Sequence, residues 1–358
     1  MWIGGPGVCL LEDKVRKVYQ YLYDNADSII RYEASKALGI DSAKLRSEMI
    51  GHPQVQYWLD CSRQFMQMSV VHNSFDTCLE NWMHKLLSFG VRESDDRQLK
   101  EINAFILDRI KSNTGRHAFD NFNGTIAASW LVCMGYEDKV VTGLIKDRVE
   151  IIHSFIKDRD YNIYISPKGH PSIPKARAMH PLVDPRLYEN DKWKLPTVHD
   201  IFAFANLPEV LKNDPQINSK IEDIIEYILE ERYQRLYRGY GLMLVPPNKY
   251  YSMGWSVHLD RFFDTDDGVG LDGVVLAMEL MSHFKAARRS EWFKKTLVYL
   301  ETFGFDGLYI FPPAYLNEGK NKYYVLGGHM GLGENRRVKA SLLLESTAWM
   351  QRISKNIG

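Results

Sequence analysis

Hydrophobic residues recur along much of this chain at the spacing of an α-helix. In residues 217–229, isoleucine and leucine side chains follow one another at steps of three and four, with acidic residues between them. Residues 99–110, 141–156 and, more weakly, 293–303 repeat that pattern. Because such spacing gathers apolar side chains on one face of a helix, each segment is predicted as an amphipathic helix that covers a core with that face.

A second kind of segment is apolar on nearly every side. It occurs four times, at residues 125–134, 201–207, 269–284 and 341–350. A helix that is apolar all round must be covered all round. Since the two kinds alternate along the chain, they predict helical hairpins arranged in two layers, with buried inner helices and a one-faced outer wall. The fold class expected is all-α.

An aromatic turn follows three of the amphipathic helices. Residues 159–165, 238–244 and 305–311 each combine Gly or Asp with aromatic and aliphatic residues, and a proline-rich loop comes next. A recurring unit of this kind indicates stacked supersecondary elements. The alternative is that helix ends in general attract Gly, Tyr and Pro.

This order of outer helix, aromatic turn, loop and buried helix resembles the α/α toroid of terpenoid cyclases and protein prenyltransferases, over about residues 70–354. The resemblance implies a two-layered barrel around a central cavity in residues 71–358. Residues 1–70 would then form an N-terminal helical extension packed on the barrel. Polysaccharide lyases and some glycosidases use similar barrels, so the fold alone does not fix a reaction.

An acidic tetrapeptide, Asp264-Thr265-Asp266-Asp267, precedes one buried segment. It resembles the DxDD motif of class II terpene cyclases. By that resemblance Asp266 would protonate an alkene or epoxide, with Asp264 and Asp267 as its partners. The alternative is a helix cap, because aspartate is favoured at helix N-termini.

Aromatic and polar side chains gather in the loop before that tetrapeptide. Tyr250, Tyr251 and Trp255 offer ring faces to a ligand, and His258 is a candidate catalytic residue beside them. The same rings would also suit a loop that simply packs down over the fold.

Two polar residues, His199 and Asp200, open an otherwise apolar helix after Thr197, its predicted N-cap. His199 is a candidate catalytic residue, and Asp200 a candidate for substrate binding. Glu345 lies inside another apolar run, where a carboxylate must be paired, protonated or functional, and an arginine partner is expected.

The glycine-rich segment 327–333 precedes the last buried helix. His329, Arg336 and Arg337 are candidates for binding an anionic substrate group there, and Glu334 is a candidate catalytic acid. A tight turn with solvated arginines explains the same residues without a ligand.

The composition sets limits on partners. Forty-five basic and forty-five acidic residues cancel, so no chain-wide attraction to nucleic acid is expected. The four cysteines show no CxxC pair and the histidines no HxxxH spacing, so neither a metal nor another cofactor is predicted. No apolar run reaches membrane length, which predicts a cytoplasmic protein without stable membrane insertion.

Three hypotheses about function remain open at this stage. The first is acid-initiated cyclisation or isomerisation of an isoprenoid-like substrate in the barrel cavity. The second is a lyase or hydrolase acting on an oligosaccharide, and the third is a non-catalytic helical scaffold. In a barrel, the loops in residues 167–196, 246–268 and 312–335 should meet at one end. The residues expected around one concave site there are His199, Trp255, His258, Asp266, His329 and Glu334.

Overall fold

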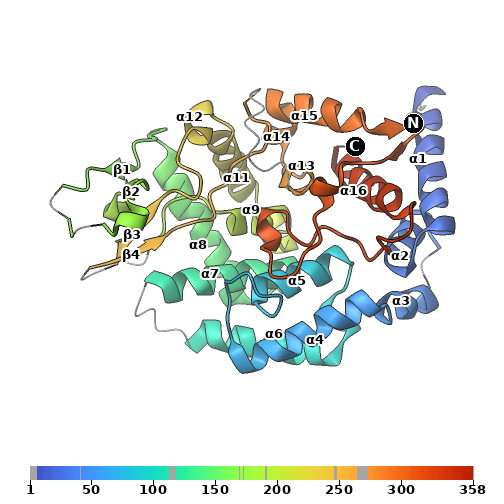
Figure 1. Ribbon diagram of the computed structural model, residues 1–358, viewed down its shortest axis with the longest axis horizontal. Helices are drawn as coiled ribbons and strands as arrows, with labels where there is room; N and C mark the ends of the chain where they lie inside the picture. The colour runs from blue at the N-terminus through green and yellow to red at the C-terminus, as the bar shows by residue number, and fades with distance from the viewer. Residues whose placement is uncertain are drawn as a thin grey trace. The chain divides into compact units, whose positions relative to one another are not determined.

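The computed structural model describes residues 6–40, 42–112, 118–168, 170–171, 173–189, 192–245, 248–263 and 273–357. Among them are sixteen α-helices and six short β-strands (Figure 1). The chain is therefore mostly helical, as the periodicity predicts. The arrangement of those helices as a closed two-layered barrel stays a prediction.

The chain divides into two compact units. Unit 1 comprises Met1–Asn103, Asp264–His283 and Glu291–Gly358, so the two ends of the chain fold together. Unit 2 comprises Ala104–Phe263 and Phe284–Ser290. Residues 1–70, predicted as an N-terminal extension, lie in unit 1.

Unit 1 is built mainly of helices, with one short β-hairpin. Its elements are α1 (Pro6–Asn25), α2 (Ser28–Ala37), α3 (Ala43–Ile50), α4 (Pro53–Met68), α5 (Leu79–Ser88), α13 (Val274–Met281), α15 (Glu291–Glu301), α16 (Ser341–Ile357), β5 (Gly304–Phe305) and β6 (Leu308–Tyr309). Helix α6 (Arg97–Ser112) begins in unit 1 and ends in unit 2. Helix α16 packs on α13 and on strand β6, and α4 packs on α5.

Unit 2 combines eight helices, counting the end of α6, with a small sheet in its described residues. Its remaining elements are α7 (Ala118–Cys133), α8 (Lys139–Ile156), α9 (Val198–Ala205), α10 (Glu209–Lys212), α11 (Pro215–Ile228), α12 (Glu231–Gln234), α14 (Lys285–Arg289), β1 (Tyr164–Ile165), β2 (Leu182–Val183), β3 (Leu242–Val245) and β4 (Lys249–Ser252).

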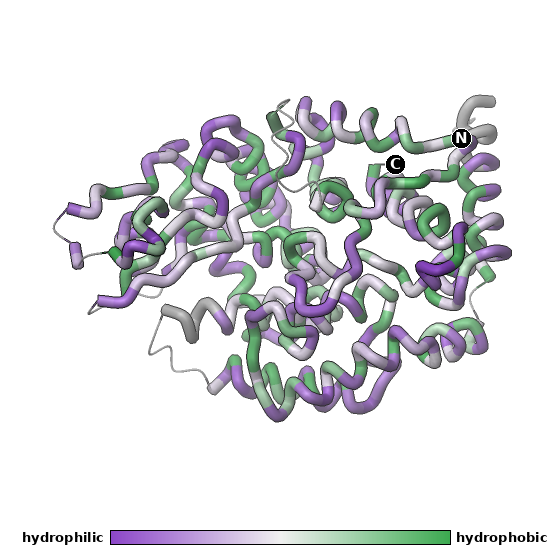
Figure 2. Tube along the Cα trace, in the orientation of Figure 1, coloured by the Kyte–Doolittle hydropathy of each residue, from purple (hydrophilic) through white to green (hydrophobic). Residues whose placement is uncertain are grey.

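The helices of unit 2 fall into the two kinds that the sequence predicts. Residues 198–204 of α9 and residues 126–133 of α7 are buried throughout, and these two helices pack on each other. Helices α8 and α11 bury one apolar face and expose the other, and each of them alternates between hydrophobic and hydrophilic residues along its length (Figure 2). Asp214 caps α11 by accepting from the backbone N–H groups of Gln216 and Ile217.

The predicted aromatic turns lead into short strands. Residues 159–165 end in β1, and residues 238–244 lead into β3, which pairs antiparallel with β4 and parallel with β2. Residues 305–311 overlap the β5–β6 hairpin, which spans residues 304–309. The sequence of these three segments indicates only a turn. In the structure, strand pairing provides hydrogen-bond partners for their backbone N–H and C=O groups.

Every helix among the described residues is too short or too polar to span a bilayer.

Candidate functional site

The polar face of α5 is the centre of the candidate site in unit 1. Residues Leu79–Leu86 of this helix are all buried, and four of them are polar: Glu80, Asn81, His84 and Lys85. Residues four positions apart lie above one another on a helix. Glu80 and His84 therefore form one column, and Asn81 and Lys85 form a second.

The second column binds a segment near the end of the chain. Lys85 Nζ donates to a carboxylate oxygen of Glu318 at 2.8 Å, to the carbonyl of His329 at 2.8 Å and to the carbonyl of Gly331. Its side chain is 1% exposed, and burial lowers its pKa, against the opposing effect of Glu318. Asn81 Oδ1 accepts from the backbone N–H of Tyr324 at 3.0 Å. These polar contacts dock residues 318–331 on α5.

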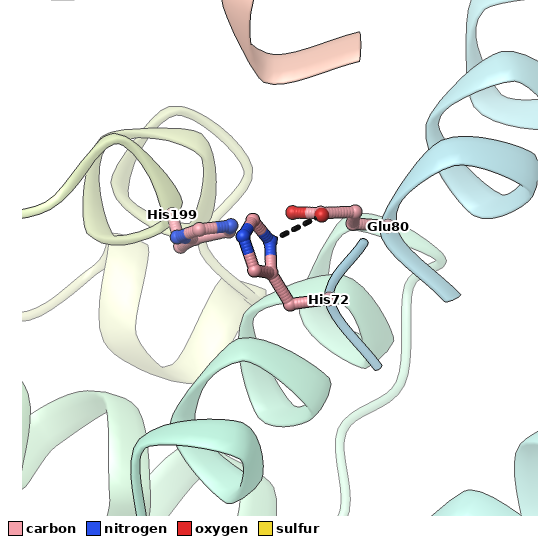
Figure 3. A group of neighbouring side chains, drawn as sticks. All are labelled: His72, Glu80 and His199. Atoms are coloured by element: carbon pink, nitrogen blue, oxygen red, sulfur yellow. Dashed lines mark ion pairs between the residues drawn. The ribbon is translucent and has the colours of Figure 1, made fainter. Parts of the chain in front are cut away.

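The first column carries a histidine–carboxylate dyad. Nδ1 of His72 forms an ion pair with Oε1 of Glu80, which comes from the first turn of α5 (Figure 3). The Glu80 side chain is 0% exposed, whereas that of His72 is 24% exposed. The His72 ring stacks on Tyr323, with centroids 5.2 Å apart, and the His84 ring stacks on Tyr324 at 4.4 Å. A buried carboxylate therefore orients an imidazole that reaches the surface of unit 1.

Asp76 joins three segments of unit 1. One of its carboxylate oxygens accepts from the Tyr57 hydroxyl at 2.7 Å, and the other accepts from the backbone N–H of Asn321 at 3.0 Å. Nε2 of His329 lies 3.5 Å from the second oxygen. Burial and the hydrogen bond to Asp76 raise the pKa of Tyr57. The Tyr57 phenol is therefore held protonated.

His329 is fixed by its backbone as well as its ring. Its φ of 63° lies in the left-handed region, and this turn aims its carbonyl at Lys85. Nε2 donates to the carbonyl of Lys322 at 2.9 Å. Burial lowers the pKa of His329. His329 thus has a structural role in docking residues 318–331.

The other candidates of the glycine-rich segment surround Glu345 of α16. One oxygen of this buried carboxylate accepts from the backbone N–H groups of Leu332 and Glu334, and Arg336 forms an ion pair with the other. Arg336 is the arginine partner expected for Glu345 from the sequence. Its charge is neutralised by this ion pair within the protein. Burial raises the pKa of Glu345 to about 7.

Glu334 and Arg337 lie at the edge of this arrangement. The Glu334 carboxylate accepts from the backbone N–H of Asp27 at 2.7 Å, and burial raises its pKa. Arg337 is exposed, and its backbone N–H donates to the side chain of Asn335.

In unit 2, Asp200 completes the start of α9. It accepts from the backbone N–H and the hydroxyl of Thr197, both at 2.8 Å, which confirms Thr197 as the N-cap. The same carboxylate accepts from Nε and Nη2 of Arg148 at 2.9 and 2.8 Å. Because it accepts four hydrogen bonds, two of them from the buried Arg148, Asp200 has a structural role.

His199 and Trp255 lie together in unit 2. The His199 ring contacts the rings of Trp130 and Trp255 edge-to-face, with centroids 5.5 and 6.1 Å apart. The backbone N–H of Val198 donates to the carbonyl of Trp255 at 2.9 Å, which ties the loop to α9. Trp255 has a φ of 64°, a strained value for a bulky side chain.

Both ring nitrogens of His258 bind within unit 2. Nε2 donates to the carbonyl of Leu236 at 2.9 Å, and Nδ1 accepts from the hydroxyl of Ser256 at 2.7 Å. Burial lowers the pKa of His258 to about 4. This histidine is therefore neutral near pH 7, and each of its ring nitrogens has a hydrogen-bond partner.

The remaining candidates differ in exposure. Tyr250 is buried, and its hydroxyl donates to the carbonyl of Pro171, whereas Tyr251 is 38% exposed. Asp264, Asp266 and Asp267 lie outside the described residues.

The dyad and the rest of the polar face of α5 are not among the site residues predicted from the sequence. The pattern of residues 79–86 could have predicted this site. Glu80, Asn81, His84 and Lys85 alternate with Leu79, Trp82, Met83 and Leu86 in a segment that is apolar enough to be buried. Polar residues at the buried positions of such a helix need partners, and these partners mark a site.

Comparison of the chain with models of known families, with curated proteins and with solved structures finds no match in any of the three. The chemistry of the site must therefore be inferred from its own geometry. His72 and Glu80 suit proton transfer, and both are also residue types that ligate metal ions.

Proposed function

We propose that this protein is an enzyme that works by general acid–base catalysis, with His72 as the catalytic residue and Glu80 as its positioning residue. The observation that carries the proposal is the ion pair between the partly exposed His72 and the fully buried Glu80. The Glu80 carboxylate lies against Nδ1 and holds the imidazole in one orientation. Its negative charge stabilises the imidazolium that forms when His72 takes a proton.

The substrate class that we propose is a saccharide, handled by a lyase or hydrolase. The supporting observations are the ring that stacks on His72 and other aromatic and polar groups of unit 1. Tyr323 stacks on His72, Tyr57 binds Asp76 through its hydroxyl, and Phe75 is 53% exposed. Aromatic faces suit the apolar faces of sugar rings, and the polar groups suit their hydroxyls.

Activity against a panel of neutral and acidic oligosaccharides tests this proposal. For a substrate that turns over, His72→Ala should lower kcat by about 10²–10⁴-fold, which is the usual contribution of a positioned acid or base. Glu80→Gln should lower kcat less and alter the pH profile. His283→Ala is the matched control because its side chain, 31% exposed, contacts Glu279 elsewhere in unit 1.

A chelator separates proton transfer from metal chemistry. Full activity in EDTA is the expected result. Loss of activity in EDTA, with recovery on addition of Zn²⁺, would instead assign His72 and Glu80 as metal ligands. Full activity of His72→Ala would contradict both interpretations.

A second candidate is acid-initiated cyclisation of an isoprenoid-like substrate in an α/α barrel formed by residues 71–358. The supporting observation is that residues 126–133 of α7 and 198–204 of α9 are buried throughout, as inner helices would be, while α8 and α11 each bury one face. Asp266 would donate the proton, with Asp264 and Asp267 as its partners. Incubation with polyprenyl diphosphates and squalene-like substrates tests it, and turnover that persists in Asp266→Asn would exclude it.

A further inference from the structure

The loop between β1 and β2, residues 166–181, is a basic segment in a chain without net charge. Residues 161–183 contain Lys168, Lys175 and Arg177, and no aspartate or glutamate. The adjoining strands β3 and β4 lie within residues 239–259, which carry Lys249 and likewise no acidic residue. We call residues 166–181 the basic loop. Its positive charge is not neutralised by carboxylates within these two segments.

Contacts within unit 2 fix the described part of the basic loop in one conformation. Ile173 packs against the core of the sheet, which is formed by Leu182, Leu242 and Tyr250. The Tyr250 hydroxyl donates to the carbonyl of Pro171, and the Arg177 guanidinium donates to the carbonyl of Tyr250. Nδ1 of His180 accepts from the Tyr237 hydroxyl at 2.9 Å. A loop with these anchors presents its outer side chains without a large cost in conformational entropy.

The outer side chains of the basic loop combine charge with apolar surface. Met179 is 90% exposed, although Ile173 of the same loop is packed inside. Ala176 and Ala178 beside it are exposed, as are Lys168 and Lys175. An apolar side chain that is exposed to water close to lysines gains nothing from that exposure in solution. A charged bilayer surface can bind both, because it offers phosphates to the lysines and an apolar layer to the methionine.

We propose that the basic loop docks this protein reversibly on an anionic lipid bilayer. Lys168 and Lys175 would lie against lipid phosphates, and Met179 would enter the boundary between headgroups and acyl chains. Electrostatic attraction brings the loop to the surface, and burial of the methionine adds an apolar contribution. A bilayer is favoured over a nucleic acid because phosphate–sugar backbones bind the lysines but provide no apolar layer for Met179.

Sedimentation of the full chain with vesicles tests the proposal. Vesicles of phosphatidylcholine with about a quarter phosphatidylglycerol should bind the protein roughly tenfold better than pure phosphatidylcholine, and added salt should release it. Lys168→Ala/Lys175→Ala should lower binding about tenfold, and Met179→Asp should lower it at constant charge on the lysines. Lys294→Ala/Lys295→Ala on α15 removes two exposed cations elsewhere and should leave binding unchanged.

Equal binding to both vesicle types, or none to either, would overturn the proposal. So would binding of RNA through Lys168 and Lys175 with no binding of vesicles, since that result assigns the loop to a polyanion. Circular dichroism of each variant establishes that it is folded, and the exposure of the substituted side chains makes loss of structure unexpected.

Discussion

Individual side chains in this protein have pKa values that differ from those in water. His258 in unit 2 is kept neutral by burial, which outweighs the opposing effect of its hydrogen bond to the Leu236 carbonyl. In unit 1, burial raises the pKa of Glu345 to about 7, so that this carboxyl gains a proton near neutrality. Each shift links the stability of the fold to pH.

The first prediction concerns His258. Its pKa is about 4 in the folded chain, against an ordinary value of 6.5. Between these two pH values the unfolded chain binds a proton at His258 and the folded chain does not. The resulting stabilisation is present above pH 6.5 and is lost as pH falls toward 4, by roughly 3 kcal/mol at most. Urea unfolding at pH 7.5 and pH 5 should show a smaller difference for His258→Gln than for the wild type. A variant with the wild-type pH dependence would refute this.

The second prediction concerns two glycines of unit 2. Gly241 has a φ of 109°, and a Cβ there would lie 2.4 Å from the carbonyl oxygen of Pro181. Gly241→Ala should therefore lower the free energy of unfolding by about 2–3 kcal/mol. Gly143, inside α8, has no atom within 4 Å of its added Cβ, so Gly143→Ala should raise stability by about 0.5–1 kcal/mol. Thermal unfolding of the two variants should shift in opposite directions.

At the scale of elements, α5 organises unit 1 through buried polar contacts. Its Asn81 and Lys85 bind residues 318–331, and its Glu80 orients His72. A buried polar face holds a segment in one register because each donor must meet its acceptor. The site and the docking of residues 318–331 thus depend on the same helix.

Lys85 provides the test of that dependence. Lys85→Ala removes the cation that pairs with Glu318 and leaves the carbonyls of His329 and Gly331 without the Lys85 donor. Removal of one partner from a buried ion pair costs about 3–5 kcal/mol, which denaturant unfolding can measure. Lys44→Ala is the control, because the Lys44 side chain is 85% exposed and its pair with Glu48 contributes little. Equal stabilities of the two variants would contradict the role of Lys85.

At the scale of the whole molecule, the first and last parts of the chain build one unit. Arg352 of α16 binds both carboxylate oxygens of Glu33 of α2, at 2.9 and 2.6 Å, and the carbonyl of Ser88 at 2.8 Å. The vesicle experiment concerns the basic loop of unit 2, so its outcome is independent of the dyad in unit 1.

The bidentate pair predicts how the chain ends contribute to stability. Arg352→Ala should lower the free energy of unfolding by about 2–3 kcal/mol, since it removes a charged hydrogen-bonded group from buried surroundings. Arg352→Lys should restore only part of this loss, because an ammonium cannot bind both oxygens in the planar geometry of a guanidinium. Lys355→Ala in the last turn of α16 should be nearly neutral. Full stability of Arg352→Lys would show that charge alone is sufficient.

The positions of several helices and some of their local chemistry follow from the sequence. The spacing of Ile217, Ile221 and Ile224 predicts α11, and Thr197 predicts the start of α9, because these features depend on residues within a few positions of one another. The need of Glu345 for an arginine also follows from its apolar surroundings in the sequence. Whether the helices close into a barrel stays a prediction.

Which polar residues contact one another depends on the tertiary fold. Lys85 and Glu318 are 233 positions apart, and no local pattern joins them. Asp200 has the residue type of a ligand-binding group, yet Arg148 and Thr197 occupy its oxygens. No sequence motif marks His72 as a candidate. Its role is indicated by the contact with the buried Glu80, which only the folded chain shows. Burial, pairing and pKa depend on neighbours in space, and packing supplies those neighbours from distant parts of the chain.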